Sequence, residues 1–466
     1  MTEVNAEAKA EPEPHPAAGA AEIAARVRGG ASSAVAEVRA ALRAVARGDT
    51  GLNAFAEVWP RAAQERAAHV DAALARGADL PLAGVPIGVK AWEGTASLQA
   101  RRLVAAGAVP VGATSVPGPG TPWRTWGTTD RGRTANPWRA DATPGGSSAG
   151  SGAAVGAGLV PLATAGDGAG STRIPAAWCG AVGYKPTTGL LPARDPAGLA
   201  VGGPIARTVA DVRLYARVVL GAATDGPGAA GARTGAGTVR PGRLRVVWSS
   251  DLGFAEVDPE IEHVAHTALL AWARGSSARP VPVNPADASA RPGTSAPDGR
   301  DREGAQAAAA GGGAGGRGGR WGVVDVVAAG LDCVDPAGEW FARREAPGRA
   351  GAAEGDPDRG AGSVAGHNRA RLDALFSGAD LLATPTTPNR PHGHDGPGEV
   401  MSVALTWLFN ITGHPAISLP AGFTADGLPV GLHLVAPHHR DGLLLRAAAD
   451  YQAVCPWPPT PWPSTS

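Results

Sequence analysis

The chain has 466 residues, enough for one large domain or for roughly two to three ordinary ones. Its 42 basic and 42 acidic residues balance, so no overall field favours nucleic acid or a cationic partner. Three dispersed cysteines (Cys179, Cys333, Cys455) without a CxxC pair argue against a disulfide framework and a zinc site. No apolar run reaches the roughly 18 residues of a membrane helix. Because the acidic N-terminus also lacks a secretory segment, we expect a cytoplasmic protein without a membrane partner.

The first part of the chain predicts a tail followed by two helices. Ala, Pro and Glu dominate residues 1–20, which favours disorder. Ser32 or Ser33 can cap the first helix, whose valines and leucine fall on one face. Pro60 can open the second helix, and Gly77 can end it. This pattern indicates packing and no chemistry.

Strands and helices then alternate. Residues 82–89 predict a short buried strand that leads to Lys90, residues 100–106 predict a helix, and residues 109–114 predict the next strand. The alternation predicts a mixed α/β fold. The small and apolar neighbours of Lys90 suit a desolvated lysine, whose pKa falls until the amine is neutral.

The segment 116–139 is rich in loop-forming residues and carries three tryptophans, Trp123, Trp126 and Trp138. Aromatic side chains in such a loop either line a pocket or cover the core, and the sequence leaves both open.

Two turns that carry serine stand within residues 143–188. They are GGSS at 145–148 and GAGS at 168–171, and between them an apolar run at 153–162 predicts a buried helix that leads to a strand. Glycine permits positive φ and close approach of other groups, so the hydroxyls of the two turns can meet at one place. Either turn alone is a weak signal.

This stretch resembles the signature of the amidase signature hydrolases, whose hallmark is a Ser-cisSer-Lys triad. The matching positions are Gly145–Ser148, Asp167, Gly170–Ser171, Arg173–Ala177, Cys179–Gly180 and Lys185–Thr187. The resemblance implies that Ser171 is the nucleophile and that Ser147, after a cis peptide bond, is the bridging serine. Lys90, at the end of GVPIGVK, matches the third member.

The resemblance also implies a reaction, in which a carboxylic acid amide is hydrolysed to the acid and ammonia or an amine through a Ser171 acyl-enzyme. Ser147 would pass the nucleophile's proton to neutral Lys90, and Ser148 and Arg173 would support the site. No metal or organic cofactor is needed, the partner is a small-molecule amide, and a homodimer is left open. The expected oxyanion hole consists of the backbone N–H groups of Asp167, Gly168, Ala169 and Gly170.

The remaining sequence predicts further ordered segments around a low-complexity middle. We expect a loop at 190–204, a helix from Ile205 to about Leu220, an exposed loop at 221–239, a strand at 244–248 and a helix capped by Asp258. Three strands are expected at 379–388, 410–420 and 427–435, the last two about a hairpin-like turn. Residues 281–320 and 345–362 are expected to be mobile, because Gly, Ala and charge there bury little apolar area.

The domain organisation follows. We expect residues 1–20 to form a disordered tail, and the resemblance implies that residues 21–460 form a single amidase domain with a mixed central sheet sandwiched by helices. Within it we place a signature core at 82–215, a low-complexity insertion at about 275–365 and a C-terminal part at 375–455.

Two further patterns indicate no site. Gly311, Gly313 and Gly316 spell G-x-G-x-x-G, but no strand precedes them and no helix cap follows, which favours a flexible linker. A Pro/Gly loop holds His392, His394 and Asp395, and we interpret it as a solvated turn and not as a metal site.

Three alternatives compete with an amidase that uses Ser171 as its nucleophile. Residues 146–150 spell G-x-S-x-G with Ser148 at the centre, but the polar, proline-broken segment before it is no buried strand, so we reject a nucleophile elbow. A glutaminase-type subunit of a tRNA-dependent amidotransferase stays open. So does an inactive relative that serves as a binding protein, because Ala91 follows Lys90 where the family has aspartate and the segment to Ser147 is short.

Overall fold

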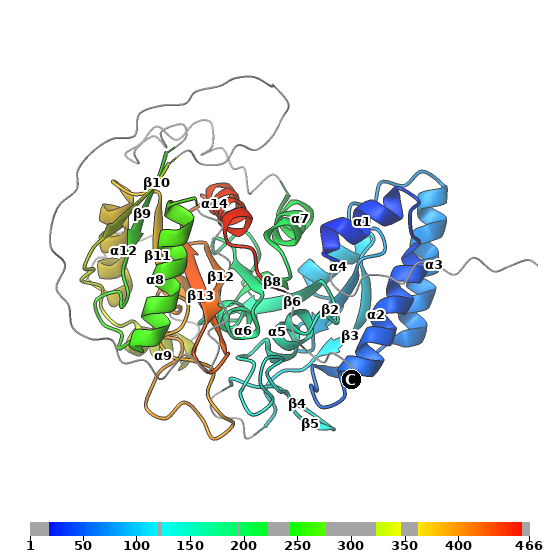
Figure 1. Ribbon diagram of the computed structural model, residues 1–466, viewed down its shortest axis with the longest axis horizontal. Helices are drawn as coiled ribbons and strands as arrows, with labels where there is room; N and C mark the ends of the chain where they lie inside the picture. Colours follow the sequence, from blue (N-terminus) through cyan, green and yellow to red (C-terminus); the bar gives the residue numbers. More distant parts are fainter. Residues whose placement is uncertain are drawn as a thin grey trace, which may run out of the picture.

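The computed structural model describes residues 18–119, 124–193, 195–221, 243–275, 323–345 and 362–458. One mixed sheet of eleven strands draws strands from all six ranges, with helices packed on both faces (Figure 1). In order of adjacency its strands are β1 (Phe55–Val58), β3 (Val109–Thr114), β2 (Pro86–Lys90), β6 (Leu162–Asp167), β8 (Val201–Ala206), β7 (Val182–Lys185), β12 (Ala416–Phe423), β13 (Pro429–Val435), β11 (Leu381–Pro385), β9 (Arg243–Trp248) and β10 (Val323–Ala328). A separate two-stranded ribbon joins β4 (Thr128–Thr129) to β5 (Gly132–Arg133).

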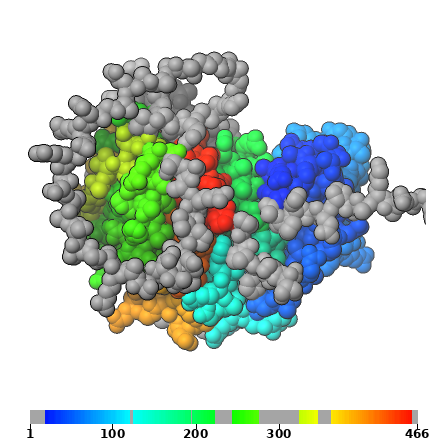
Figure 2. Space-filling view, viewed as in Figure 1, coloured from blue at the N-terminus to red at the C-terminus, as the bar shows by residue number. Residues whose placement is uncertain are grey.

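Among the described residues, two helices precede the first strand in the sequence, one follows the last strand, and the others lie between strands. The helices are α1 (Ala20–Arg28), α2 (Ala34–Gly48), α3 (Pro60–Ala75), α4 (Leu98–Ala105), α5 (Ala149–Gly156), α6 (Arg173–Cys179), α7 (Val209–Val219), α8 (Pro259–Ala273), α9 (Ala337–Glu345), α12 (Val364–Phe376), α13 (Leu408–Ile411) and α14 (Asp441–Val454). Figure 2 shows the N-terminal helices in blue and α8 in green at opposite ends of the long axis. Within the described ranges, no helix is both long and apolar enough to span a membrane.

The sheet joins the two halves of the predicted domain. β7, which follows the second serine turn, pairs antiparallel with β12, so that Lys185 lies opposite Ala416. Pairing is parallel between β2 and its neighbours β3 and β6, and antiparallel between β12 and β13. The prediction of a single mixed α/β domain is therefore confirmed.

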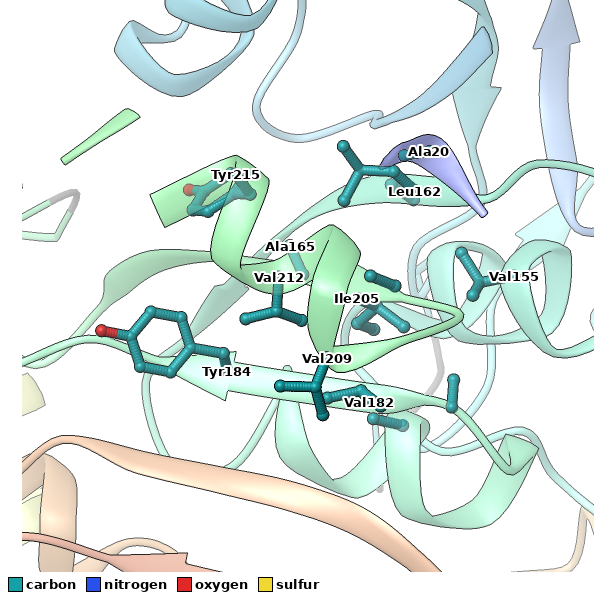
Figure 3. Packing of buried hydrophobic residues seen from close by; sticks show 14 of the residues in the cluster. Ala20, Val155, Leu162, Ala165, Val182, Tyr184, Ile205, Val209, Val212 and Tyr215 are labelled. Carbon is teal, nitrogen blue, oxygen red and sulfur yellow. The ribbon is translucent and has the colours of Figure 1, made fainter. Parts of the chain in front are cut away.

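The alternation of side chains along β13 explains the two layers of core. Leu432 and Leu434 belong to the main apolar cluster, which includes residues of α7, α8 and α14. Val435 points to the opposite face and joins a second cluster with Leu372 of α12. Figure 3 shows the main cluster beneath α7, where Val209 and Val212 lie over strand residues that include Ile205.

Several predicted boundaries are confirmed. Ser33 caps α2 by accepting from the Ala36 N–H at 3.1 Å, and Asp258 caps α8 by accepting from the Glu260 N–H at 2.9 Å. α3 begins at Pro60, and Gly77 takes a φ of 83° just past its end. β3 covers residues 109–114 as expected.

Other predicted boundaries were wrong. The strand expected at 82–89 is β2, which starts at Pro86 and includes Lys90, and the helix expected from the apolar run at 153–162 is α5, which ends at Gly156. The expected loop at 190–204 ends in strand β8, which starts at Val201 and places the start of α7 at Val209 instead of Ile205. Glycine in this strand is required by packing, because a Cβ on Gly203 would lie 2.1 Å from the Tyr184 carbonyl oxygen. The strand expected from residue 410 begins only at Ala416, since α13 occupies Leu408–Ile411.

The middle of the chain contains more structure than its composition indicates. β10 pairs in parallel with β9, and α9 follows it, both inside the expected insertion at about 275–365. Helix α1 was also not predicted. The predictions for the tail up to residue 17, for 222–239, for 281–320 and for 346–361 concern residues outside the described ranges.

Candidate active site

The core of the sheet delivers Lys90 into a buried position. All five residues of β2 are buried, and Lys90 at its end is only 3% exposed. Its backbone N–H donates to Thr164 Oγ1 of β6 at 2.9 Å. The Lys90 Nζ lies 3.0 Å from Ser147 Oγ, 2.8 Å from Ser148 Oγ and 3.3 Å from the Gly166 carbonyl oxygen.

At the two glycines of the first serine turn, the surrounding backbone leaves no room for a Cβ atom. A Cβ on Gly146 would lie 1.9 Å from the Arg124 carbonyl oxygen. The peptide bond between Gly146 and Ser147 is cis, in agreement with the resemblance. Ser148 follows, fully buried, and its N–H donates to the Ser171 carbonyl at 3.3 Å. That bond joins the two serine turns.

The second serine turn is held by side chains from distant elements. The Gly168 carbonyl accepts from Trp340 Nε1 at 2.8 Å, and the Ala169 carbonyl accepts from Thr406 Oγ1 at 2.5 Å. The Gly170 N–H donates to Asp167 Oδ1 at 2.7 Å. The Gly170 N–H, one of the expected oxyanion donors, is thus engaged by a carboxylate within its own turn.

Asp167 and Arg173 form an ion pair with no solvent exposure at either side chain. Arg173 donates to Asp167 Oδ1 at 2.8 Å and to Oδ2 at 2.9 Å, and its third donor contact is Asn410 Oδ1 at 2.7 Å. Burial raises the pKa of the Asp167 carboxyl, but the charge and hydrogen bonds of Arg173 outweigh this effect and hold that pKa well below its ordinary value. The carboxylate stays ionised and anchors the turn.

His433 completes this buried network from β13. Its Nε2 lies 3.1 Å from Arg173 Nη1, and since arginine can only donate, Nε2 accepts and Nδ1 carries the proton. Nδ1 faces Thr384 Oγ1 at 3.3 Å. Burial, followed by the charge of Arg173, lowers the pKa of His433 well below its ordinary value, so the ring is neutral.

A cavity of about 810 Å³ opens beside the two turns. Lys90, Ser147 and half-buried Ser171 line its floor, together with Gly168 and Ala169. Ser148 is not among the lining residues. No hydrogen bond joins Ser147 to the Ser171 hydroxyl within the described residues. The apolar residues around the rest of the cavity are Trp92, Ile174, Ala200, Trp340, Phe341, Pro397, Val400, Met401, Val403 and Trp407.

Comparison with known proteins identifies the family of the chain. The amidase family model matches residues 36–292 and 341–445, which is more than half of the chain. The chain belongs to the amidase signature family. The family acts on amide C–N bonds, and the chain is accordingly an amide hydrolase by family.

Individual relatives agree with that assignment. An acylamidase of Rhodococcus erythropolis is 37% identical, over 76% of this chain and 74% of its own length. A putative amidase, AmiB2 of Mycobacterium tuberculosis, is 32% identical over 94% of this chain and 96% of its own. The crystal structure of a bacterial aryl acylamidase of the amidase signature family superposes with a TM-score of 0.69 at 23% identity and covers 95% of this chain and 97% of its own. This structural likeness supports the fold.

In this amidase-family chain, the other aromatic and histidine residues considered in the sequence do not line the cavity where the structure describes them. The ring centroids of Trp126 and His394 lie 5.4 Å apart in an edge-on pair, and those of Trp138 and Phe423 lie 4.8 Å apart. Neither tryptophan is among the residues that line the cavity. Trp123 lies outside the described residues. His392 is half-buried against Trp178 and is not the solvated turn residue that we expected.

A different group of residues in this amidase-family chain could hold a metal ion. Asp373, His414 and His438 each offer a ligand atom within 4.8 Å of the others, and none of the three lines the cavity. His414 Nδ1 and His438 Nε2 both contact Thr412, at 3.0 Å to its hydroxyl and 2.7 Å to its carbonyl oxygen. The dispersed sequence positions gave no ligand spacing from which this group could be predicted.

Sequence reasoning also missed four residues that hold the second serine turn: Trp340, Thr406, Asn410 and His433. All come from the last 127 positions of the chain, far from the signature. Asn410 and His433 lie in segments expected as strands, but none of the four was assigned a role.

Proposed function

We propose that the chain hydrolyses a linear carboxylic acid amide to the acid and ammonia or an amine through an acyl-enzyme on Ser171. One observation carries this proposal. The buried Lys90 amine lies within hydrogen-bond distance of Ser147 Oγ, and both side chains line the same cavity as Ser171. A nucleophile, a proton carrier and a base are therefore present on one wall.

The contacts of Lys90 suit the role of base. A neutral amine has two N–H donors and one lone pair, and the Ser147 and Ser148 hydroxyls and the Gly166 carbonyl are among the groups within its reach. With the N–H groups directed to Ser148 and to the Gly166 carbonyl, the lone pair is left for the Ser147 hydroxyl proton. Ser147 then takes the proton of Ser171 as Ser171 Oγ attacks the amide carbonyl. The missing Ser147–Ser171 hydrogen bond forms when substrate binds, as catalytic contacts often tighten only in the complex.

The collapse of the tetrahedral intermediate reverses the relay. The proton returns from Lys90 through Ser147 to the leaving nitrogen, the C–N bond breaks, and the acyl group remains on Ser171 Oγ. Water then attacks the ester as one of its protons passes to the same relay. The bond between the acyl carbon and Ser171 Oγ breaks, the relay returns the proton to Ser171 Oγ, and the acid leaves. The backbone N–H groups of Gly168 and Ala169, which line the cavity, are our revised donors for the oxyanion.

Ser148 has a supporting role in this scheme. It is fully buried and lies outside the cavity lining, so a substrate carbonyl cannot reach it. Its Oγ is the nearest contact of Lys90 Nζ, at 2.8 Å, and it also accepts from the Gly166 N–H at 3.4 Å. Both contacts position the lysine.

The test is a screen of purified protein for ammonia release from aliphatic, aryl and amino-acid amides. Ser171→Ala should abolish hydrolysis and leave the thermal unfolding midpoint intact. Ser147→Ala should lower kcat by about 10²-fold or more, and Ser148→Ala by only about tenfold. Loss of all activity in Ser148→Ala together with full activity in Ser171→Ala would overturn the proposal. Absence of activity on every amide would favour the inactive relative.

A further inference from the structure

Helix α9 builds one wall of the cavity and is tied directly to the second serine turn. Trp340 of α9 donates its Nε1–H to the Gly168 carbonyl at 2.8 Å and packs into a small apolar cluster with Leu199 and Ile411. The preceding residue, Glu339, accepts from the Ala365 N–H at 2.7 Å and so fastens α9 to the start of α12.

The wall is aromatic. The Trp340 ring lies 5.2 Å from Phe341 in an edge-on arrangement and 6.4 Å from Trp407 in a tilted one. Trp92, whose ring lies 5.5 Å from Lys90 Nζ, contributes a further indole to the same cavity. The aromatic side chains that line the cavity offer ring faces and edges to another planar ring, because aromatic pairs favour offset and edge-on contact by about 0.5–1.5 kcal/mol beyond burial alone.

Exposed apolar side chains gather at this cavity. Trp92 is 53% exposed and Phe341 is 47% exposed, and Val400 and Met401 are exposed beside them. Across the described residues, six large hydrophobic side chains are exposed, and these four of them line the cavity. Apolar surface gathered in this way marks a binding region, since covering it with an apolar ligand is favourable.

The charged residues at the mouth do not select one sign of charge. Arg124, Arg344, Glu93 and Glu345 line the cavity, and Arg344 stacks over the Trp340 ring at 4.8 Å. Two cations and two anions give little net attraction for a charged substrate. Shape and apolar character therefore decide what this cavity takes.

We propose that the amide cleaved at Ser171 carries an aryl group held against the aromatic wall, and that Trp340 also positions the oxyanion donors. This inference rests on the proposed function. Because a trans peptide unit is planar, its C=O and N–H point in opposite directions. By holding the Gly168 carbonyl, Trp340 fixes the direction of the Ala169 N–H. Trp340 is thus a positioning residue for the reaction and a specificity residue for the substrate.

The first experiment compares benzamide, cyclohexanecarboxamide, acetamide and acetanilide as substrates of the full chain. Benzamide and cyclohexanecarboxamide have the same number of ring carbons, but only benzamide is planar. We expect kcat/KM for benzamide or acetanilide to exceed that for cyclohexanecarboxamide by about tenfold. The two aryl amides distinguish an aryl group on the acyl side from one on the leaving group.

The second experiment separates the two roles of Trp340. Trp340→Phe keeps a ring but removes the N–H donor, so kcat should fall about tenfold on every amide with KM changed less than twofold. Trp340→Leu removes both features and should also abolish the preference for planar substrates. Trp138→Phe is the matched control, because half-buried Trp138 donates Nε1–H to the Cys179 carbonyl at 2.9 Å away from the cavity. It should leave kcat and the preference unchanged.

Two outcomes would overturn this inference alone: equal kcat/KM for planar and non-planar amides, or an unchanged kcat in Trp340→Phe, each with hydrolysis still dependent on Ser171. Failure of the proposed function has a different signature, which is the lack of Ser171-dependent hydrolysis of any amide in the panel.

Discussion

The two walls of the cavity are built in different ways. The wall that carries Ser171 rests on a fully buried ion pair, Asp167 with Arg173, which is bonded in turn to Asn410 and His433. The wall formed by α9 has no fully buried residue and is held by hydrogen bonds of Trp340 and Glu339. In our proposals the reacting groups belong to the buried core, whereas substrate choice depends on a segment with few attachments, whose Trp340 also holds one of the oxyanion donors.

The largest effect on kcat is expected when Lys90, the proposed base, is replaced. Lys90→Met keeps the apolar volume of the buried stem but removes the amine, so kcat should fall by about 10³-fold or more. Ammonia release under saturating substrate measures kcat, and near-ultraviolet circular dichroism checks the fold. Retention of more than a tenth of the activity would show that Lys90 is not the base.

The second prediction tests how strongly the ion pair supports that wall. Arg173→Met leaves the Asp167 carboxylate buried without its cation and should lower the free energy of unfolding by about 3–5 kcal/mol. The double variant Asp167→Asn with Arg173→Met should lose less than the single variant, because no uncompensated charge remains. Guanidinium chloride unfolding measures both. A double variant less stable than the single one would contradict this account.

A third prediction concerns the pH dependence of stability and the buried Lys185, which interacts electrostatically with Asp167 and Arg173. Burial, followed by the charge of Arg173, lowers the pKa of Lys185 from 10.5 to about 7, against the opposing charges of Asp167 and Asp441. Between these values the unfolded chain binds a proton that the folded chain does not. The free energy of unfolding should therefore rise from pH 7 to pH 9, by at most about 1.4 kcal/mol per pH unit for one proton.

Lys185→Met isolates this contribution. The slope of unfolding free energy against pH should be smaller in the variant than in the parent chain, as measured by guanidinium chloride unfolding at pH 7, 8 and 9. Equal slopes in the two proteins would show that Lys185 does not titrate in this range.

The smallest effect is expected on the α9 wall. Glu339→Ala removes the acceptor for the Ala365 N–H, so KM for an aryl amide should rise about three- to fivefold with kcat within twofold. Glu22→Ala is the control, since Glu22 pairs with Arg26 four residues along the surface helix α1. It should change neither constant. A fall in kcat without a change in KM would show that Glu339 acts on the reaction and not on substrate binding.

The sequence was most informative where local rules act. Caps, prolines and glycines placed α2, α3 and α8, and the two serine turns together with Lys90 were found from their resemblance to the amidase signature. The structure brings Lys90, Ser147 and Ser171 to one cavity, as the resemblance implied.

The sequence was least informative where contacts between residues far apart in the chain determine the structure. Strand β8 reads as a loop because of Gly202, Gly203 and Pro204, and only the neighbouring Tyr184 backbone explains the need for glycine there. The segment 323–345 is short and lies between Gly-rich stretches, so composition hid both β10 and α9. Trp340 is 172 residues from Gly168, and no sequence rule connects them.

The most direct measurement is to label the intact chain with a serine-directed acylating probe and locate the modified residue by peptide mass spectrometry. The account predicts modification of Ser171 alone, and a labelling rate strongly reduced in Lys90→Met. Modification of Ser147 or Ser148 in place of Ser171, or full amide hydrolysis in Ser171→Ala, would contradict it.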